Sequence, residues 1–354
     1  MSAVVFDAVN IVFGETPLSA LPLMDAGQSR ARIQADTGQI LGVHDCSLDV
    51  AQGEILVLMG LSGSGKSTLL RAVNGLNPVC RGEVRVNDGG EMVSVTHADA
   101  ATLRRLRLTR IAMVFQQFGL LPWRSVADNV GLGLELGGMD RATREARVRA
   151  QLALVNLSDW ATRRVGELSG GMQQRVGLAR AFATEAPILL MDEPFSALDP
   201  LIRTRLQDEL LQLQKNLRRT IIFVSHDLDE AFKIGDRIAI MEGGRIVQCG
   251  TPQEIVRKPA DAYVAEFVQH MNPLGVLRAG AIARALDGPP PPDSIAVEAE
   301  TPLREVIALR LDGGREIVVT RDGAPVGRIG EAEILGALAG AGRTDGEERP
   351  VGGI

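Results

Sequence analysis

The chain has 354 residues, enough for one large domain and a smaller one, and 45% of them are hydrophobic, enough to fill a buried core. Aromatic residues make up only 3%, so aliphatic side chains must form that core. A net charge of −6 without a long basic block argues against nucleic acid as a partner. Cys46, Cys80 and Cys249 are too scattered for a metal site or a disulfide framework.

The start of the sequence has no positively charged region that would direct export, since its first basic residue is Arg30. The longest apolar run near the front, at 55–59, is too short to cross a bilayer. We therefore expect no signal peptide, no transmembrane segment and a place in the cytoplasm.

Strands and helices alternate along most of the chain. The elements predicted before residue 120 are strands at 4–13 and 43–59, a helix at about 66–75, antiparallel strands at 82–87 and 92–95, and a strand at 111–115. Residues 126–185 lack strand alternation and are predicted to be mostly helical. The later elements are strands at 188–191, 221–225 and 237–241, with a helix at about 201–217. This order predicts an α/β fold with a mainly parallel sheet and an inserted helical block.

The proline-rich run at 287–293 cannot continue a helix and indicates a stiff linker. We expect a large domain over 1–275, a helical subdomain within it at about 120–180, a linker over 276–294, a small unit over 295–340 and a disordered tail over 341–354.

Residues 60–67, Gly-Leu-Ser-Gly-Ser-Gly-Lys-Ser, fit the phosphate-binding loop pattern in full, between a predicted strand and a predicted helix. The glycines let successive N–H groups point at phosphate oxygens, and the helix adds its positive dipole end. Lys66 is expected to reach the β- and γ-phosphates, and Ser67 to bind Mg²⁺. The nucleotide-binding residues predicted here are Gly60, Ser62, Gly63, Ser64, Gly65, Lys66, Ser67 and Thr68.

The apolar strand at 188–191 ends in Asp192 and Glu193, at the sheet edge where open α/β folds bind ligands. Asp192 is predicted to bind the nucleotide's Mg²⁺, and Glu193 to act as general base on the attacking water. An apolar run ending in two acids is usually only a strand that reaches solvent, so this prediction depends on the phosphate loop. Together the two motifs predict ATP and Mg²⁺ as cofactors.

A second anion site is predicted where a helix begins within residues 168–175, Leu-Ser-Gly-Gly-Met-Gln-Gln-Arg. The serine caps the helix, and the two glycines leave its first N–H groups accessible to an anion. In this order and spacing the motif resembles the signature of ABC ATPases. The resemblance covers residues 4 to about 270. It implies a P-loop NTPase cassette with a mainly parallel sheet core, an antiparallel β subdomain and the inserted helical subdomain.

The resemblance also assigns three further residues. Gln116 matches the glutamine that links Mg²⁺ and the attacking water to the helical subdomain, although Gln117 is an equally plausible polar loop residue. Asp199 matches the D-loop aspartate, which could also simply begin the next helix. His226 matches the switch histidine that contacts the γ-phosphate, where a lone histidine is more often structural.

In this family two copies close head to tail around two ATP molecules. The resemblance therefore implies a homodimer in which phosphates held by Lys66 of one copy meet Ser169, Gly170 and Gly171 of the other. It also implies separate transmembrane permease subunits, contacted through residues 118–123, and a substrate-binding protein outside the membrane. The chain would then work at the cytoplasmic face of the cell membrane.

Cassettes of this type usually carry an aromatic residue that stacks on adenine, a short distance before the phosphate loop. That place falls near Thr37, where the sequence has no ring. Adenine is then expected to rest on aliphatic side chains such as Ile40 or Val43, or on a ring from elsewhere in the chain. Weak discrimination between ATP and GTP is the predicted consequence.

The long N-terminal segment and the stretches at 191–203 and 225–231 are similar to importers of quaternary amines. Residues 120–126 and 270–274 look most like the choline branch, so choline is the expected cargo and an osmoregulated glycine betaine or proline betaine importer is the alternative. The unit at 295–340 resembles half of a CBS-domain pair, with either a regulatory role or only a dimerising one.

Rival functions fit less well. DNA-repair ABC proteins need long coiled coils, and ribosomal ones usually fuse two cassettes; the sequence has neither. A P-loop kinase or GTPase has no use for residues 168–175 or His226, and a scaffold does not need Glu193 beside Asp192. A non-transport ABC ATPase stays a remote alternative.

Overall fold

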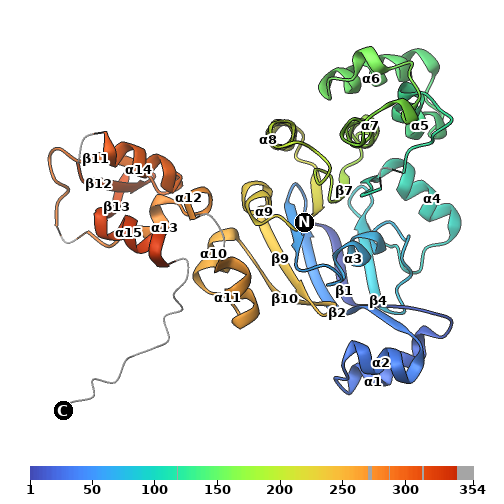
Figure 1. Ribbon diagram of the computed structural model, residues 1–354, viewed down its shortest axis with the longest axis horizontal. Helices are drawn as coiled ribbons and strands as arrows, with labels where there is room; N and C mark the ends of the chain where they lie inside the picture. Colours follow the sequence, from blue (N-terminus) through green and yellow to red (C-terminus); the bar gives the residue numbers. More distant parts are fainter. Residues whose placement is uncertain (118, 270–272, 287, 313–314, 341–354) are drawn as a thin grey trace. The chain divides into compact units, whose positions relative to one another are not determined.

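The computed structural model describes residues 1–117, 119–269, 273–286, 288–312 and 315–340. These divide into two compact units, one of residues 1–226 and 239–246, the other of residues 227–238 and 247 onward (Figure 1). Each unit is described by itself.

The core of the first unit is a six-stranded sheet in the order β10-β9-β3-β8-β7-β6. Its strands are β3 (Ile55–Met59), β6 (Ile111–Val114), β7 (Ile188–Asp192), β8 (Thr220–Val224), β9 (Arg237–Glu242) and β10 (Arg245–Gly250). Strands β3, β8, β7 and β6 are parallel neighbours. Every residue of β3, β7 and β8 is buried, as the apolar runs predict for strands covered on both faces. Because these strands are parallel, the segments that follow them meet at one edge.

A four-stranded sheet, in the order β2-β1-β4-β5, confirms the predicted antiparallel β subdomain. It comprises β1 (Ser2–Phe13), β2 (Ile40–Ala51), β4 (Arg81–Asn87) and β5 (Met92–Ser94), all antiparallel neighbours. The last pair of the β1–β2 ladder joins Phe13 to Ile40, so the two residues lie side by side.

Short helices that were not expected from the sequence are inserted between β1 and β2. They are η1 (Pro17–Ala20), α1 (Leu21–Asp25) and α2 (Arg30–Thr37). A small core of their own holds them against the sheet, formed by Val12, Ala20, Met24, Ile33 and Leu41. Each helix is too short for the apolar periodicity by which helices are recognised in a sequence.

The predicted helical block is present as α5 (Val126–Leu136), α6 (Arg141–Leu154) and α7 (Gly170–Ala183), which Figure 1 shows gathered together. These helices share a core that includes Val130, Leu152 and Val176. Ser125 and Asp128 form a capping box at the start of α5. The other helices of this unit are α3 (Lys66–Ala72), α4 (Ala100–Thr109) and α8 (Pro200–Leu217).

The second unit contains a three-stranded sheet in the order β11-β12-β13. Its elements are α9 (Leu228–Ile234), α10 (Pro252–Arg257), α11 (Ala262–Gln269), α12 (Pro273–Val276), α13 (Ala279–Ile282), β11 (Ile295–Glu298), α14 (Leu303–Leu311), β12 (Ile317–Arg321), β13 (Ala324–Ile329) and α15 (Glu331–Gly340). Strands β11 and β12 are parallel, and β12 and β13 antiparallel.

The small unit extends further toward the N-terminus than its expected start at residue 295. Leu277 and Ala279 are buried in the same hydrophobic core as Val297 and Leu303. Arg284 also pairs with Arg328 in an isolated β-bridge. Residues 277–284, expected to be part of a linker over 276–294, are therefore packed, because their apolar side chains complete the core of the small sheet. The expected disordered tail at 341–354 lies outside the described residues.

Across the part of the chain that the structure describes, no helix combines the length and the apolar character that a membrane span requires.

Candidate active site

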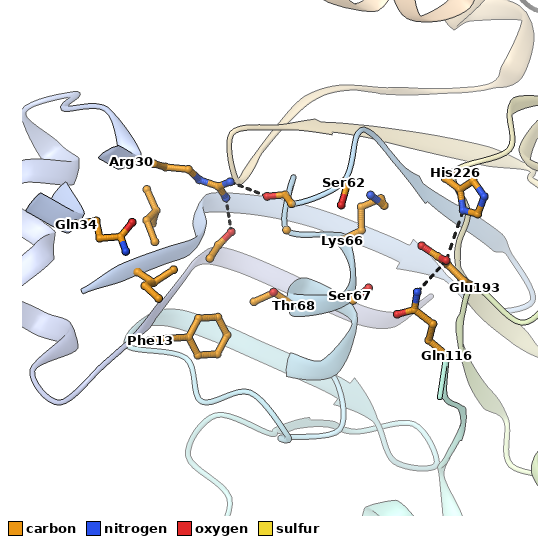
Figure 2. Close-up of a pocket in the computed structure, with 15 residues that line it drawn as sticks. Phe13, Arg30, Gln34, Ser62, Lys66, Ser67, Thr68, Gln116, Glu193 and His226 are labelled. Atoms are coloured by element: carbon orange, nitrogen blue, oxygen red, sulfur yellow. Dashed lines mark hydrogen bonds and ion pairs between the residues drawn. The ribbon is translucent and has the colours of Figure 1, made fainter. Parts of the chain in front are cut away.

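A cavity of about 670 Å³ lies at the edge where the parallel strands end. Its walls come from segments far apart in the sequence, as Figure 2 shows. On one side are residues of the 62–68 segment with Gln116, Glu193 and His226. On the other side are Phe13 and residues around α2.

The phosphate loop needs glycine at two positions for reasons that the structure makes explicit. Gly60 has φ +140°, and a Cβ there would lie 2.1 Å from the Met241 carbonyl oxygen. Gly65 has φ +103° at the N-cap of α3, and a Cβ there would lie 2.7 Å from the Gly42 carbonyl oxygen. Only glycine fits such positions without a backbone shift, so the loop can curl tightly at the head of α3.

Lys66 is buried and held by the same loop. Its Nζ donates to the carbonyl oxygens of Gly60 at 2.8 Å and Leu61 at 2.9 Å. Burial lowers the pKa of the Lys66 ammonium, and the carboxylates of Glu193 and Asp192 oppose that shift. The ammonium is therefore fixed beside the two acids at the end of β7.

Asp192 is fully buried and has two partners in α3. The Ser67 hydroxyl donates to Asp192 Oδ1 at 2.6 Å, and Arg71 Nη2 lies 2.8 Å from Oδ2. A hydroxyl and a carboxylate are hard oxygen donors of the kind that Mg²⁺ takes together with substrate phosphates. Among the described residues, no cluster of three or more His, Cys, Asp or Glu side chains could hold a metal by itself. These two residues thus fit a Mg²⁺ ion that the nucleotide helps to hold.

Glu193 lies at the centre of the three predicted catalytic residues. Its carboxylate accepts a hydrogen bond from Gln116 Nε2 at 3.0 Å and lies 3.5 Å from His226 Nδ1 (Figure 2). The three side chains follow β7, β6 and β8, whose ends share one edge of the sheet. The Glu193 side chain is 18% exposed and that of His226 63%, so a solvent molecule can reach the carboxylate.

The backbone of Glu193 is left-handed, with φ +47°. Its N–H donates to the Val224 carbonyl oxygen at 3.2 Å, which continues the pairing of β7 with β8 by one residue. Residues other than glycine rarely adopt such a conformation, and where they do it clusters at functional sites. The turn aims the carboxylate away from the sheet and toward Gln116.

The structure does not bring the predicted signature residues to the same cavity. Ser169 caps α7, its hydroxyl accepting from the Met172 N–H at 3.4 Å, and Asp199 caps α8 in the same way through the Ile202 N–H at 3.0 Å. Gly170 is exposed, and a Cβ added there would meet nothing within 4 Å. In the described chain, neither the signature residues nor Asp199 lines the cavity.

A ring from elsewhere in the chain does reach this cavity, which is one of the two alternatives expected for the base site. Phe13 lines the cavity beside Ile40, whereas Val43 is fully buried and does not. Gly42 keeps this end open, since a Cβ there would lie 2.9 Å from the Phe13 ring. The helices between β1 and β2 lengthen the distance to the phosphate loop, so counting back from the loop pointed to Thr37. An aromatic residue at the end of the first strand was the available signal.

Gln174 is a second residue that the sequence did not reveal. Its side chain is buried, its Nε2 donates to the Glu193 carbonyl oxygen at 3.2 Å, and its Oε1 accepts from the Ala197 N–H at 3.2 Å. The signature helix α7 is thereby tied to the segment that carries Glu193. No sequence signal distinguishes it from the polar residues beside it.

Comparison with known proteins agrees with this geometry. The family model described as ABC transporter matches residues 43–196. The trimethylamine N-oxide transport system ATP-binding protein of Ruegeria pomeroyi is 45% identical over 343 residues, which cover 96% of this chain and 97% of that protein. The chain belongs to the ATP-binding proteins of ABC transporters.

Two further matches support the assignment of this ABC ATPase. The glycine betaine/proline betaine transport system ATP-binding protein of Escherichia coli is 50% identical over 273 residues, covering 77% of this chain and 67% of that protein. A solved dimeric ATP-binding cassette with bound ADP and phosphate matches with a TM-score of 0.60 at 29% identity, covering 70% of this chain and 98% of the other. The P-loop NTPase fold predicted from the sequence is thus confirmed.

Proposed function

We propose that this ABC ATPase hydrolyses ATP in the cavity at the strand ends, with Glu193 as general base. The observation that carries the proposal is the position of the Glu193 carboxylate. It lies at the edge that the phosphate loop also occupies, held by Gln116 at 3.0 Å and facing His226 at 3.5 Å. A general base must lie within hydrogen-bond reach of the proton it removes, and a side chain on this edge faces the γ-phosphate end of a nucleotide bound to the loop.

In the proposed reaction, the loop N–H groups and Lys66 hold the β- and γ-phosphates. The attacking water gives its proton to Glu193 while its oxygen bonds to the γ-phosphorus, and the bond from that phosphorus to the bridging oxygen of ADP breaks. Gln116 and His226 orient the water and the γ-phosphate. Mg²⁺ held by Ser67 and Asp192 would neutralise charge on the phosphate oxygens.

The signature residues, of which Ser169 and Gly170 are exposed and Gly171 is partly exposed, support a site completed by a second copy. Ser169, Gly170 and Gly171 begin an α-helix of 14 residues, where N–H groups without intrahelical partners favour an anion. They do not line the cavity of their own chain in the part that the structure describes. In a head-to-tail homodimer they would contact the phosphates held by the partner copy, with Asp199 at the same interface.

ATP turnover at saturating MgATP tests the catalytic assignment. Glu193→Gln keeps the size of the side chain and its ability to accept from Gln116, but removes the base, so we expect hydrolysis to fall about 10²–10⁴-fold. Glu91→Gln is the matched control, because Glu91 is exposed and lies outside the cavity. Activity of Glu193→Gln within a few-fold of the wild type would contradict the proposal.

We further propose that ATP hydrolysis drives import of a small methylated amine through separate permease subunits, fed by a substrate-binding protein. The relatives named above transport trimethylamine N-oxide, glycine betaine and proline betaine, which favours the glycine betaine class over the choline predicted from residues 120–126. Trp123 is 69% exposed and offers an anchor for a permease, because a large rigid ring buries much area on binding. A regulatory or dimerising role for residues 295–340 stays a prediction.

Uptake by cells that lack this gene tests the cargo. Wild-type chain or Glu193→Gln is returned to the cells, which then receive labelled glycine betaine, trimethylamine N-oxide or choline, each with the others as competitors. Uptake of a methylated amine that only the wild type restores supports the importer, and the competition ranks the cargo. Wild-type chain that restores uptake of none of the three contradicts the proposed cargo class while leaving the ATPase assignment intact.

A further inference from the structure

The helix α2 is firmly held beside the nucleotide cavity. Ile33 is fully buried in the small core with Met24 and Leu41. Ser29 caps the start of the helix by accepting from the Arg32 N–H at 3.3 Å, and Gly38 ends it in a left-handed conformation. The helix can therefore fix side chains that point from it toward the cavity.

Arg30, the first residue of α2, joins two backbone segments that surround the phosphate site. Its Nη1 donates to the Gly63 carbonyl oxygen of the phosphate loop at 2.7 Å, and its Nη2 to the Gly42 carbonyl oxygen of β2 at 2.7 Å (Figure 2). The slot around the guanidinium is narrow, since a Cβ at Gly244 would lie 2.6 Å from Nη2. Both contacts are charge-assisted and use the fixed fork of the guanidinium.

The hydrogen bond from Arg30 reaches a part of the phosphate loop that few other groups contact. Gly63 is exposed, with φ +77°, and a Cβ there would meet nothing within 4 Å. A second contact to the loop is the Gly244 N–H, which donates to the Ser64 carbonyl oxygen at 3.1 Å. By drawing the Gly63 carbonyl oxygen toward itself, Arg30 limits the conformations of a glycine-rich segment that must be ordered to bind phosphate. Such preorganisation increases affinity because less freedom is lost on binding.

The same face of α2 continues along the cavity. Gln34 follows Arg30 by four residues, so the two side chains lie on one side of the helix, and both line the cavity. We infer that α2 acts in nucleotide binding and that its Arg30 is a positioning residue that holds the phosphate loop in its ATP-binding shape. The inference rests on the proposed ATP site and goes beyond it, since it gives the inserted helices a role in nucleotide affinity.

Full-length Arg30→Ala, Arg30→Lys and Arg32→Ala test this role. Arg32 is the matched control, because it lies on the same helix, is exposed, and its side chain pairs with Asp36 at 2.7 Å rather than with the phosphate loop. We expect Arg30→Ala to raise the KM for ATP and the Kd for MgADP about tenfold, or ~1.4 kcal/mol, with kcat changed less than about twofold. Arg30→Lys recovers only part of the affinity, since one ammonium cannot reproduce the two-pronged contact. Arg32→Ala stays at the wild-type values.

A purely structural role for Arg30 would show in nucleotide-free protein. Without nucleotide, we expect Arg30→Ala to lower the melting temperature by less than Ile33→Ala does, because it removes two hydrogen bonds beside the cavity but leaves the small core filled. The inference is overturned if Arg30→Ala binds MgADP as tightly as Arg32→Ala, or if it melts as early as Ile33→Ala. If the wild type itself binds no nucleotide, or binds no better than Lys66→Ala, the proposed ATP site fails and the inference with it.

Discussion

The left-handed backbone of Glu193 predicts an unusual order of stability for two truncations at this residue. Glu193→Ala and Glu193→Gly both remove the contacts to Gln116 and His226, so they differ only in the backbone. In the folded state, a residue with a Cβ at φ +47° is strained by about 1–2 kcal/mol relative to glycine. In the unfolded state, the greater chain entropy of glycine lowers the stability of its variant by about 0.4–1 kcal/mol. Taking the middle of each range, the glycine variant should therefore be more stable than the alanine variant by about 0.8 kcal/mol.

Urea unfolding at 25 °C, followed by circular dichroism, measures this difference from the two midpoints. Ala146→Gly is the reference, because Ala146 is exposed in the interior of the helix α6, where glycine should be less stable than alanine by about 1 kcal/mol, the opposite order. Both Glu193 variants should fail to hydrolyse ATP because they lack the carboxylate. Backbone strain of this kind is found where it positions a catalytic side chain. An alanine variant as stable as the glycine variant, or more so, would refute the idea that Glu193 is strained.

Two further predictions concern protonation and the base site. Burial, reinforced by Arg245, lowers the pKa of His44, so the unfolded chain takes up the proton first. The contribution of neutral His44 to the free energy of unfolding is fully present above the unfolded-state pKa of about 6.5. It is lost as the pH falls through the lower pKa of the folded state. Urea midpoints measured from pH 8 to pH 5 should fall less steeply for His44→Gln than for the wild type, and as steeply as the wild type for the exposed His97→Gln. Equal pH dependence of the two variants would contradict this role of His44. Phe13→Ala should raise the Kd for ATP and GTP alike, about tenfold, because stacking on a ring does not distinguish bases. Phe13→Tyr should stay near wild type in the same titration, and a loss confined to ATP would count against stacking.

The central chemistry could be predicted from the sequence because its motifs are local. The loop at 60–67 and the strand ending in Asp192 each depend on neighbouring residues, and the parallel order of the strands then brings their ends together. Gln116 and His226 follow strands of the same sheet, which accounts for their place near Glu193, but only the resemblance to ABC ATPases singled them out in the sequence. The roles assigned to them stay predictions until variants are measured.

Phe13, Arg30 and Gln174 could not be found in the same way. The cavity wall near Phe13 forms only because β1 and β2 pair across an insertion that shows no clear periodicity. Arg30 contacts residues 12 and 33 positions further along the chain. The contacts of Gln174 likewise depend on the packing of α7 against the segment after β7. Such contacts follow from tertiary packing, which propensity and spacing do not encode.

The small C-terminal unit shows the same limit. Proline marks where a helix cannot continue, so the run at 287–293 predicts part of a linker. Leu277 and Ala279 nevertheless pack with Val297, because a three-stranded sheet needs apolar cover on its face. Prolines show where a helix must end, but they do not show which of the residues before or after them pack into the hydrophobic core.

If ATP joins two copies across paired sites, the mass of Glu193→Gln in solution should depend on the nucleotide. Size exclusion with light scattering should give 37.8 kDa without nucleotide and twice that mass with MgATP, returning to 37.8 kDa with MgADP. Adding Ser169→Arg should abolish the ATP-dependent dimer, because the larger side chain occupies the space meant for the partner's phosphates. A mass that stays at 37.8 kDa with MgATP, or a dimer that forms equally without it, would contradict the account.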